Sequence, residues 1–396
     1  MDPHAGQWLG LALRWLHVVA GISWIGTSFY FNWLNSSIRP PQPPEPGVAG
    51  ELWSVHGGGF YRSVKYGVAP ERLPATLHWF KWEAYVTWLS GIALLVLIYY
   101  FDAAAYLVDP RHAGVTTRPA VGIGLATLIA GWLAYDLLCR SPLANRGGAL
   151  AVVGVTLTGV LAWGLTTVLS PRAAYIHVGA LLGTLMAGNV FRVIIPAQRD
   201  MVAAMAAGRS PDARLGRHAA LRSLHNNYLT LPVLFIMVSM HYPATYGHQW
   251  GWAILVGMSL VGAGVRHWFN LRSQERHNRW ILPAAAAAMV VLAVATAPRR
   301  PAAQAGGAAG VRFDDVRVIV ARRCAGCHSS TPTHAAFSTA PAGAVLDTPE
   351  QIRALAPRIE AVAVVAQTMP LGNVTGMTSE EREILGRWVR EGATLR

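Results

Sequence analysis

Residues 149–170 read ALAVVGVTLTGVLAWGLTTVLS, a stretch without a single charged side chain. An α-helix needs about 20 apolar residues to cross roughly 30 Å of hydrocarbon, and this segment is long enough. Similar segments occur before and after it. They lie at about 8–34, 78–101, 120–139, 174–196, 225–242, 250–270 and 280–297. The sequence therefore predicts an all-α fold, a polytopic membrane bundle of about eight transmembrane helices.

The composition of the whole chain agrees with this fold class. Of the 396 residues, 53% are hydrophobic and only 13% are charged, which excludes an ordinary soluble protein. The formal net charge of +13 could indicate a protein that binds nucleic acid. The arginines, however, lie between the apolar segments, so membrane topology explains them better. We expect membrane lipid and no nucleic acid as a partner.

Basic residues are distributed unevenly among the predicted loops. Loops after the odd-numbered helices carry most of the arginines and lysines, whereas loops after the even-numbered helices carry only Arg111, Arg118 and Arg172. Loops rich in Lys and Arg stay in the cytoplasm, so eight spans place both ends of the chain outside. We predict a multi-pass protein of the bacterial inner membrane, with the residues after 297 in the periplasm.

A smaller unit follows the bundle. Residues 298–310 are rich in Ala, Pro and Gly and predict a flexible linker. Residues 311–396 contain the pattern CAGCH at 324–328, which is typical of covalent attachment of a c-type haem. No second pair of cysteines completes a zinc site. We therefore predict a small all-α c-type cytochrome domain at 311–396, with one covalent haem c and a role in electron transfer.

The pattern assigns a role to each of its reactive side chains. Cys324 and Cys327 would form thioether bonds to the porphyrin, and His328 would bind the iron from one side. The sixth ligand is expected to be a methionine further along the chain, because thioether ligation raises the potential of such a haem. Met369, which precedes a proline, is preferred over Met377, which we expect to be a packing residue.

Two histidines lie inside the predicted membrane helices. His17 and His177 occupy similar positions in the first and fifth helices, and the second and sixth helices share a Tyr-x-Thr step. The similarity suggests a duplicated four-helix unit, with chance similarity of apolar sequence as the alternative. Polar groups inside hydrocarbon are costly and usually face the bundle interior. A b-type haem held between His17 and His177 is predicted, and the alternative is that each ring satisfies a backbone carbonyl.

Three segments carry a resemblance to a known family. They are WLHVVAGISWIGTSFYF at 15–31, VHGGGFY at 55–61 and LHWFKWEA at 77–84. They resemble the PuuD type of bacterial urate oxidase, in which a multi-span urate oxidase domain is joined to a C-terminal c-type cytochrome. The resemblance implies that residues 1–297 oxidise urate to 5-hydroxyisourate. Electrons would leave through the cytochrome domain to an acceptor such as a soluble cytochrome or a terminal oxidase.

Two other functions remain open at this point. Residues 15–31 also resemble the smaller HemJ-type membrane proteins, which bind b haem and oxidise protoporphyrinogen. A porphyrinogen oxidase with a fused cytochrome is therefore the first alternative. The second is a non-catalytic membrane subunit that only transfers electrons.

Urate is an anion, so the resemblance implies a site with positive charge and proton acceptors. The long connection after the first helix contains Gly57, Gly58 and Gly59, where backbone amides can approach a flat ring closely. The catalytic candidates near it are His56, His78 and Glu83, and the substrate-binding candidates are Arg62, Lys65, Lys81, Asn226 and Asn227. A site in this connection would lie about a membrane thickness, ~30 Å, from the cytochrome domain.

Overall fold

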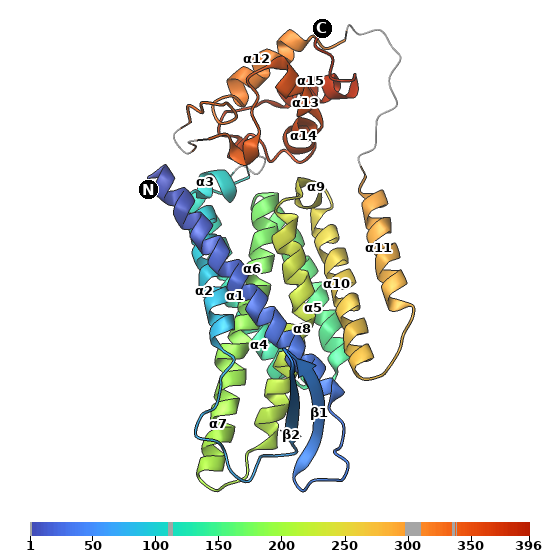
Figure 1. Ribbon diagram of the computed structural model, residues 1–396. Helices are drawn as coiled ribbons and strands as arrows, with labels where there is room; N and C mark the ends of the chain where they lie inside the picture. The colour runs from blue at the N-terminus through green and yellow to red at the C-terminus, as the bar shows by residue number, and fades with distance from the viewer. Residues whose placement is uncertain (1, 110–113, 298–309, 335–336, 338) are drawn as a thin grey trace.

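A long helical bundle carries a smaller C-terminal unit, residues 311–396, on one of its ends (Figure 1). We call the end that contacts this unit the near end and the opposite end the far end. The computed structural model describes the whole chain except residues 1, 110–113, 298–309, 335–336 and 338. Nearly all of the predicted linker, and Arg111 of a predicted loop, lie outside the described residues.

Within the described residues, eight long helices occupy the positions of the eight predicted spans. They are α1 (Pro3–Ser37), α2 (Trp82–Leu95), α4 (Thr117–Arg140), α5 (Gly147–Thr166), α6 (Pro171–Asn189), α8 (Ala213–Ser239), α10 (Gly251–Ser273) and α11 (Ile281–Ala295). Two helices continue through a π-helical turn, α2 through η1 (Val96–Tyr100) and α6 through η3 (Val190–Ile194) into α7 (Ile195–Ala206). The shorter elements are α3 (Ala103–Tyr106), η2 (Pro142–Asn145) and α9 (Pro243–Tyr246).

Five of the described helices are long and apolar enough to cross a membrane. They are His4–Ser37, Trp82–Tyr100, Thr117–Arg140, Gly147–Thr166 and Pro171–Ala206. α11 is apolar but shorter, whereas α8 and α10 are long enough but not apolar enough. Helices compatible with a membrane protein are therefore present as expected, while the total of eight spans stays a prediction.

Helix α6 lies in the middle of the bundle, where it contacts α2, α4, α5, α8 and α10. Its side chains are the most deeply buried of the bundle, and Tyr175 and Val178 are almost completely enclosed. Glycines permit this close packing. A Cβ atom at Gly179 would lie 2.7 Å from Cγ2 of Ile236, so no larger residue fits there without a shift of the neighbouring helix.

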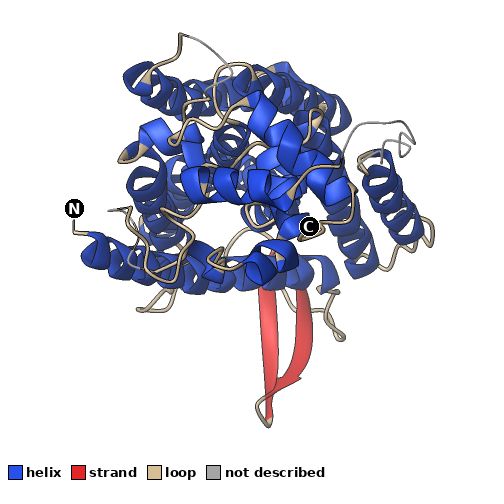
Figure 2. Ribbon diagram, turned by 90° about the horizontal axis from the view of Figure 1, so that it is seen from above, coloured by secondary structure: helices blue, strands red, loops and turns tan. Residues whose placement is uncertain are grey.

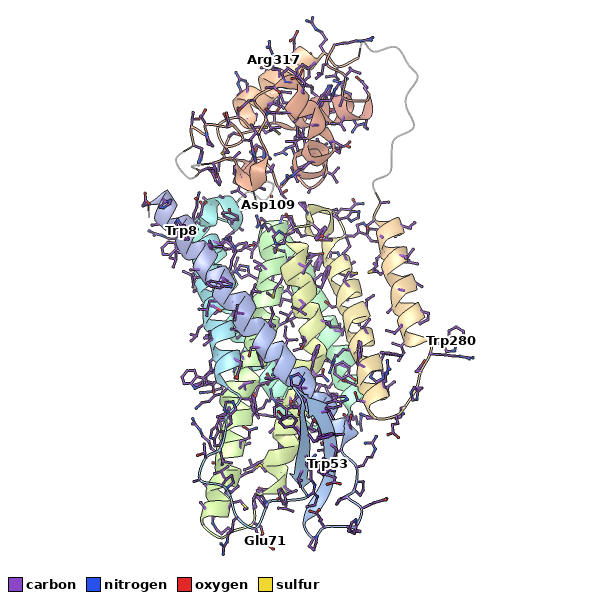
Figure 3. The ribbon with its side chains drawn as sticks, viewed as in Figure 1. Trp8, Trp53, Glu71, Asp109, Trp280 and Arg317 are labelled. Atoms are coloured by element: carbon purple, nitrogen blue, oxygen red, sulfur yellow. The ribbon has the colours of Figure 1, made fainter. Side chains whose placement is uncertain are left out.

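The connection between α1 and α2 is not a loop, and here the all-α prediction needs correction. It contains an antiparallel hairpin of β1 (Val48–His56) and β2 (Gly59–Tyr66). Gly57 and Gly58 have φ values of +56° and +80°, the positive values that both central residues of a type I′ turn require. The glycines therefore serve the turn, and the hairpin projects away from the helices with Trp53 exposed (Figures 2 and 3).

The C-terminal unit is built from short helices around its own apolar core. They are α12 (Phe313–Arg323), η4 (Pro341–Gly343), α13 (Pro349–Ala354), α14 (Ala356–Ile359), η5 (Glu360–Val365), η6 (Leu371–Asn373) and α15 (Ser379–Arg390). Trp388 is fully buried in this core, with its ring packed against that of Phe313. Thr378 and Glu381 form a capping box at the start of α15.

Two contacts, which we call the seam, join this unit to the near end of the bundle. Element η6 packs on α3, and η5 packs on α9. Gly372 has a φ of +54°, and a Cβ atom there would lie 2.6 Å from Cα of Ala105. The side chain of Thr368 reaches the hydroxyl of Tyr246 across the seam. The chain on both sides of Met369 therefore faces the bundle.

Candidate functional site: a haem motif above a polar bundle

The Cys-x-x-Cys-His motif lies at the end of α12. Cys324 is the C-cap residue of that helix. Its carbonyl oxygen accepts hydrogen bonds from the N–H groups of Cys327, at 3.1 Å, and His328, at 2.9 Å. Both thiols are free. The backbone therefore holds the three reactive residues in one tight turn.

The imidazole of His328 is fixed by its backbone surroundings. Its Nδ1 lies 3.0 Å from the carbonyl oxygen of Ala344. A carbonyl can only accept, so Nδ1 carries the proton and Nε2 keeps a lone pair for a metal, as in most metal-binding histidines. The following loop is held by Asp347, whose carboxylate accepts from the N–H of Ser330 at 2.9 Å. The hydroxyl and N–H of Ser330 hold the pKa of Asp347 below its ordinary value.

The thiols of the motif are protonated at neutral pH. Burial raises the pKa of Cys324 to about 11. Burial also raises the pKa of Cys327. Within the part of the chain that the structure describes, no group of three or more His, Cys, Asp or Glu side chains forms a metal-binding cluster.

The two methionines considered as the sixth ligand have different surroundings. Met377 belongs to the core with 3% of its surface exposed, and its N–H donates to Asn373 at 2.9 Å. Met369 is only half-buried, but its backbone is fixed on both sides. Its N–H donates to the carbonyl of Val362 at 3.0 Å, and its carbonyl accepts from Arg382 at 2.7 Å. Met369 stays the predicted ligand.

The described residues of this unit fit a c-type haem. Two free thiols stand in one turn beside an imidazole whose Nε2 is available, and a thioether follows on a fixed loop. The haem would be attached to Cys324 and Cys327 and ligated by His328 and Met369. It would supply a one-electron acceptor.

The structure does not gather the predicted substrate-binding residues into one site. Arg62 forms ion pairs with Glu45 and Glu51. Lys65 donates a hydrogen bond to Asn35. Both cations are thus engaged by neighbours within or beside the hairpin.

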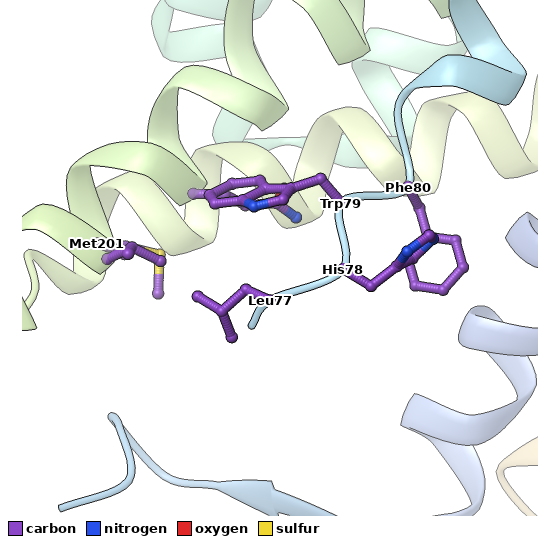
Figure 4. Close-up of a pocket in the computed structure, with 7 residues that line it drawn as sticks. Leu77, His78, Trp79, Phe80 and Met201 are labelled. Carbon is purple, nitrogen blue, oxygen red and sulfur yellow. The ribbon is translucent and has the colours of Figure 1, made fainter. Parts of the chain in front are cut away.

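Several other predicted residues lie toward the far end. His56 is exposed at the tip of the hairpin, and Glu83 is half-buried in the first turn of α2. The ammonium of Lys81 lies 5.5 Å from the ring centroid of Trp82. His78 lines a shallow cavity of about 280 Å³ (Figure 4). The lining residues are Leu77, His78, Trp79, Phe80, Gln198, Met201 and Val202.

Asn226 and Asn227, consecutive on α8, contact different helices. The side-chain oxygen of Asn226 accepts from Asn189 of α6 at 2.8 Å. Asn227 donates to Asn270 of α10 at 2.9 Å and accepts from Arg266 of the same helix. The two asparagines therefore join separate polar groups and do not form a common binding site.

Asn189 belongs to a buried polar network between α4, α6 and α8. Its amide also donates to Tyr135, whose hydroxyl lies 2.8 Å from Nδ1 of His225. Arg222, with 3% of its surface exposed, donates to Asn189 at 3.1 Å and to the carboxylate of Asp136 at 2.6 Å. This network was not predicted from the sequence. Asp136, an acid inside a predicted span, was the signal that could have indicated it.

His17 and His177 both lie toward the near end, with different partners. Nδ1 of His17 donates to the carbonyl of Thr87 at 2.9 Å. His177 is fully buried, with Nδ1 donating to the carbonyl of Ala173 at 2.8 Å and Nε2 lying 3.1 Å from the hydroxyl of Tyr100. Both nitrogens of His177 are engaged, so these residues as placed do not fit a shared b-type haem. That haem stays a prediction, and no step below depends on it.

The bundle itself can be compared with known proteins. The family model described as "Urate oxidase N-terminal" matches residues 3–297, which is most of the chain and the whole bundle. The chain belongs to the urate oxidase N-terminal family. The comparisons with curated proteins and with solved structures return no match.

This urate oxidase N-terminal domain has a second cavity, at its near end. The cavity has a volume of about 460 Å³. It is lined by Tyr100–Ala104, Thr117, Arg118 and Val121. These two cavities lie toward opposite ends of the urate oxidase domain.

Proposed function

We propose that this chain is a membrane-bound, cytochrome-linked urate oxidase, or urate hydroxylase. It converts urate to 5-hydroxyisourate and passes the electrons to a c-type haem in its C-terminal unit. The observation that carries the proposal is His328, whose Nε2 is free beside two free thiols, in a unit that follows a urate oxidase domain.

The chemistry requires an electron acceptor and a source of oxygen. Urate and water give 5-hydroxyisourate, two protons and two electrons. The c-type haem, when bound, supplies a one-electron acceptor. The C-terminal unit must therefore release the first electron before the second arrives. A downstream acceptor such as a soluble cytochrome or a terminal oxidase meets this need.

The location of the two parts follows from topology. Five long apolar helices support insertion of the bundle into a membrane. The excess of Arg and Lys in the loops after odd-numbered helices favours a cytoplasmic far end. The near end and the C-terminal unit would then lie in the periplasm of a bacterium, the side on which c-type haems are attached.

The experiment uses the full-length protein, produced with the machinery for c-type haem attachment. We expect a pyridine-haemochrome spectrum with a c-type signal, and reduction of this haem by urate without oxygen. The double variant Cys324→Ser, Cys327→Ser should lose the covalent haem and urate oxidation. Cys139→Ser, which changes the remaining cysteine, should keep both.

Two outcomes would overturn the proposal. Reduction of the haem by protoporphyrinogen but not by urate would indicate a porphyrinogen oxidase. Reduction by neither compound, in fully loaded protein, would indicate a subunit that only transfers electrons.

A further inference from the structure

The hairpin of β1 and β2 exposes large apolar side chains on one of its faces. Residues that pair across antiparallel strands share a face, and so do alternate residues of one strand. Val55 pairs with Phe60, and Trp53 lies two residues before Val55 on the same strand. These three side chains, which we call the apolar face, are 67%, 80% and 62% exposed in that order. Exposed apolar side chains that cluster in this way mark an interaction site.

The opposite face of the hairpin lies on the end of α1. Gly50 and Lys65 are paired with each other on that face. A Cβ atom at Gly50 would collide with the side chain of Ile38, the C-cap residue of α1. The ammonium of Lys65 donates a hydrogen bond to the side chain of Asn35. The apolar face therefore points away from α1, into the medium that surrounds the bundle.

Backbone hydrogen bonds fix the base of the hairpin to the chain that leaves α1. The N–H of Arg39 donates to the carbonyl of Glu51 at 3.1 Å, and the N–H of Glu51 donates to the carbonyl of Arg39 at 2.8 Å. Tyr30 and Trp33, in the last turns of α1, are partly exposed. Tyr and Trp are enriched where a membrane helix meets the polar headgroups. Because α1 is long and apolar enough to cross a membrane, the hairpin begins where this helix leaves the hydrocarbon.

The hairpin extends sideways from the bundle. Figure 1 shows it beside the far part of the bundle, and Figure 2, seen along the bundle, shows it outside the outline of the helices. Glu71, in the connection that leads to α2, lies farther along the bundle axis than Trp53 does (Figure 3). A hairpin in this position lies along the surface of a membrane that the bundle crosses.

The charges beside the apolar face are paired within the hairpin and its approach. Arg62, the cross-strand partner of Trp53, forms ion pairs with Glu45 and Glu51. Moving a charge out of bulk water is costly unless the charge is paired. These ion pairs therefore reduce the cost of placing the hairpin in a region less polar than water.

We propose that the apolar face of the hairpin lies in the lipid headgroup region of the membrane, on the side of the far end. This inference goes beyond the proposed reaction and rests only on the proposed insertion of the bundle into a membrane. A second copy of the chain fits the face less well. Two aromatic residues and a valine offer roughly 500 Å² per chain, whereas a stable interface buries about 800 Å² per partner.

The test places nitroxide spin labels on the full-length chain in vesicles of phosphatidylcholine and phosphatidylglycerol. The three natural cysteines are replaced by serine, so that an introduced cysteine is the only thiol. Single labels are attached at Phe60→Cys and at Val55→Cys, and the second variant keeps both aromatic rings of the face. Power-saturation EPR compares collisions with oxygen, which concentrates in lipid, and collisions with a nickel chelate, which stays in water.

Two matched labels calibrate the ratio of oxygen to nickel collisions. Ile22→Cys lies on the exposed surface of α1 and should give the highest ratio. Glu71→Cys lies in an exposed part of the far-end connection and should give the lowest ratio. We expect the ratios at Phe60→Cys and Val55→Cys to lie between these two values and clearly above that of Glu71→Cys.

The outcomes separate this inference from the proposed location of the bundle. A ratio at Ile22→Cys as low as that at Glu71→Cys would show that the bundle is not inserted, and the proposed location itself would fail. A high ratio at Ile22→Cys, with both hairpin labels equal to Glu71→Cys, would show that the hairpin lies in water and that only this inference is wrong. Dipolar broadening at both hairpin sites that disappears on dilution with unlabelled chains would instead assign the apolar face to a second copy.

Discussion

The hydroxyl of Tyr100 donates a hydrogen bond to Nε2 of His177, across 3.1 Å. The direction is fixed because Nδ1 of the same ring lies 2.8 Å from the carbonyl of Ala173 and must carry the proton there. Tyr100 lines the near-end cavity, whereas His177 is fully buried behind it. When the Tyr100 oxygen accepts a proton from the cavity, the Tyr100 hydroxyl can therefore pass its own proton to Nε2 of His177.

Tyr100→Phe should slow urate oxidation without preventing urate binding. The substitution removes the hydroxyl and leaves the ring, so we expect kcat to fall by about 100-fold, the lower range for loss of a positioned proton acceptor. The KM for urate should change by less than about 3-fold, since the aromatic ring that lines the cavity remains. Steady-state kinetics measures both values. Tyr30→Phe, on α1, is the control, and an unchanged kcat in Tyr100→Phe would contradict the proton route.

The two methionines of the C-terminal unit should respond differently to substitution. Met369→Leu removes the predicted sixth ligand, so the oxidised haem should become high-spin and its potential should fall. Met377→Leu changes only a core side chain and should cost less than about 1.5 kcal/mol of stability, with an unchanged spectrum. Optical spectra of the full-length variants distinguish them. The reverse result would assign Met377 as the ligand.

Gly372→Ala should open the seam. The added Cβ would meet the backbone of Ala105 at 2.6 Å, and the residue has a φ of +54° that alanine disfavours. We expect faster amide hydrogen exchange in Ala103–Tyr106 of the full-length protein. Gly376→Ala is the matched control, because its φ of +66° gives similar backbone strain while the nearest atom belongs to Arg323 of the same unit. Equal exchange in both variants would show that the seam tolerates the change.

The stability of the C-terminal unit should fall at acidic pH through Glu381. Burial would raise the pKa of Glu381, but the N–H of Thr378 and the guanidinium of Arg323 outweigh it, and the pKa lies below its ordinary value. The ionised form is therefore favoured by folding. Its stabilising effect is complete above the unfolded pKa of about 4.3 and is lost as the pH falls through the lower, folded pKa.

Glu381→Gln should flatten this acid dependence. Urea unfolding of the unit is followed by the haem absorbance of the full-length protein between pH 3 and 6. These measurements give the slope of the free energy of unfolding against pH. Glu380→Gln, a change in an exposed neighbour, should leave the slope of the wild type unchanged. A slope in Glu381→Gln equal to that of the wild type would refute the assignment.

Features formed by residues that are close together in the sequence were predictable. The Cys-x-x-Cys-His pattern is local, and the structure adds the Nδ1 contact of His328 that leaves Nε2 free, while haem attachment there stays a prediction. The hairpin was missed because Gly57 and Gly58 were interpreted as a flexible approach to a ligand. The same two glycines fit a two-residue turn between segments rich in β-branched and aromatic residues.

Contacts between distant helices were not predictable. Arg172 and Arg222 look alike in the sequence, since each lies near one end of an apolar segment and fits a topology rule. Arg222 bonds to Asp136, which is 86 residues away, whereas Arg172 meets tyrosines and no described carboxylate. Only the packing of the helices separates an arginine paired with a carboxylate from one that lies among tyrosine rings.

The environment of Cys324 affects the chain before the cofactor is attached. Its pKa of about 11 leaves only a minute thiolate fraction at neutral pH. Disulfide formation proceeds through the thiolate, so an early, unproductive bond to Cys327 should form slowly even in an oxidising compartment. In the proposed periplasmic location, the two thiols would therefore stay reduced until the predicted haem is attached.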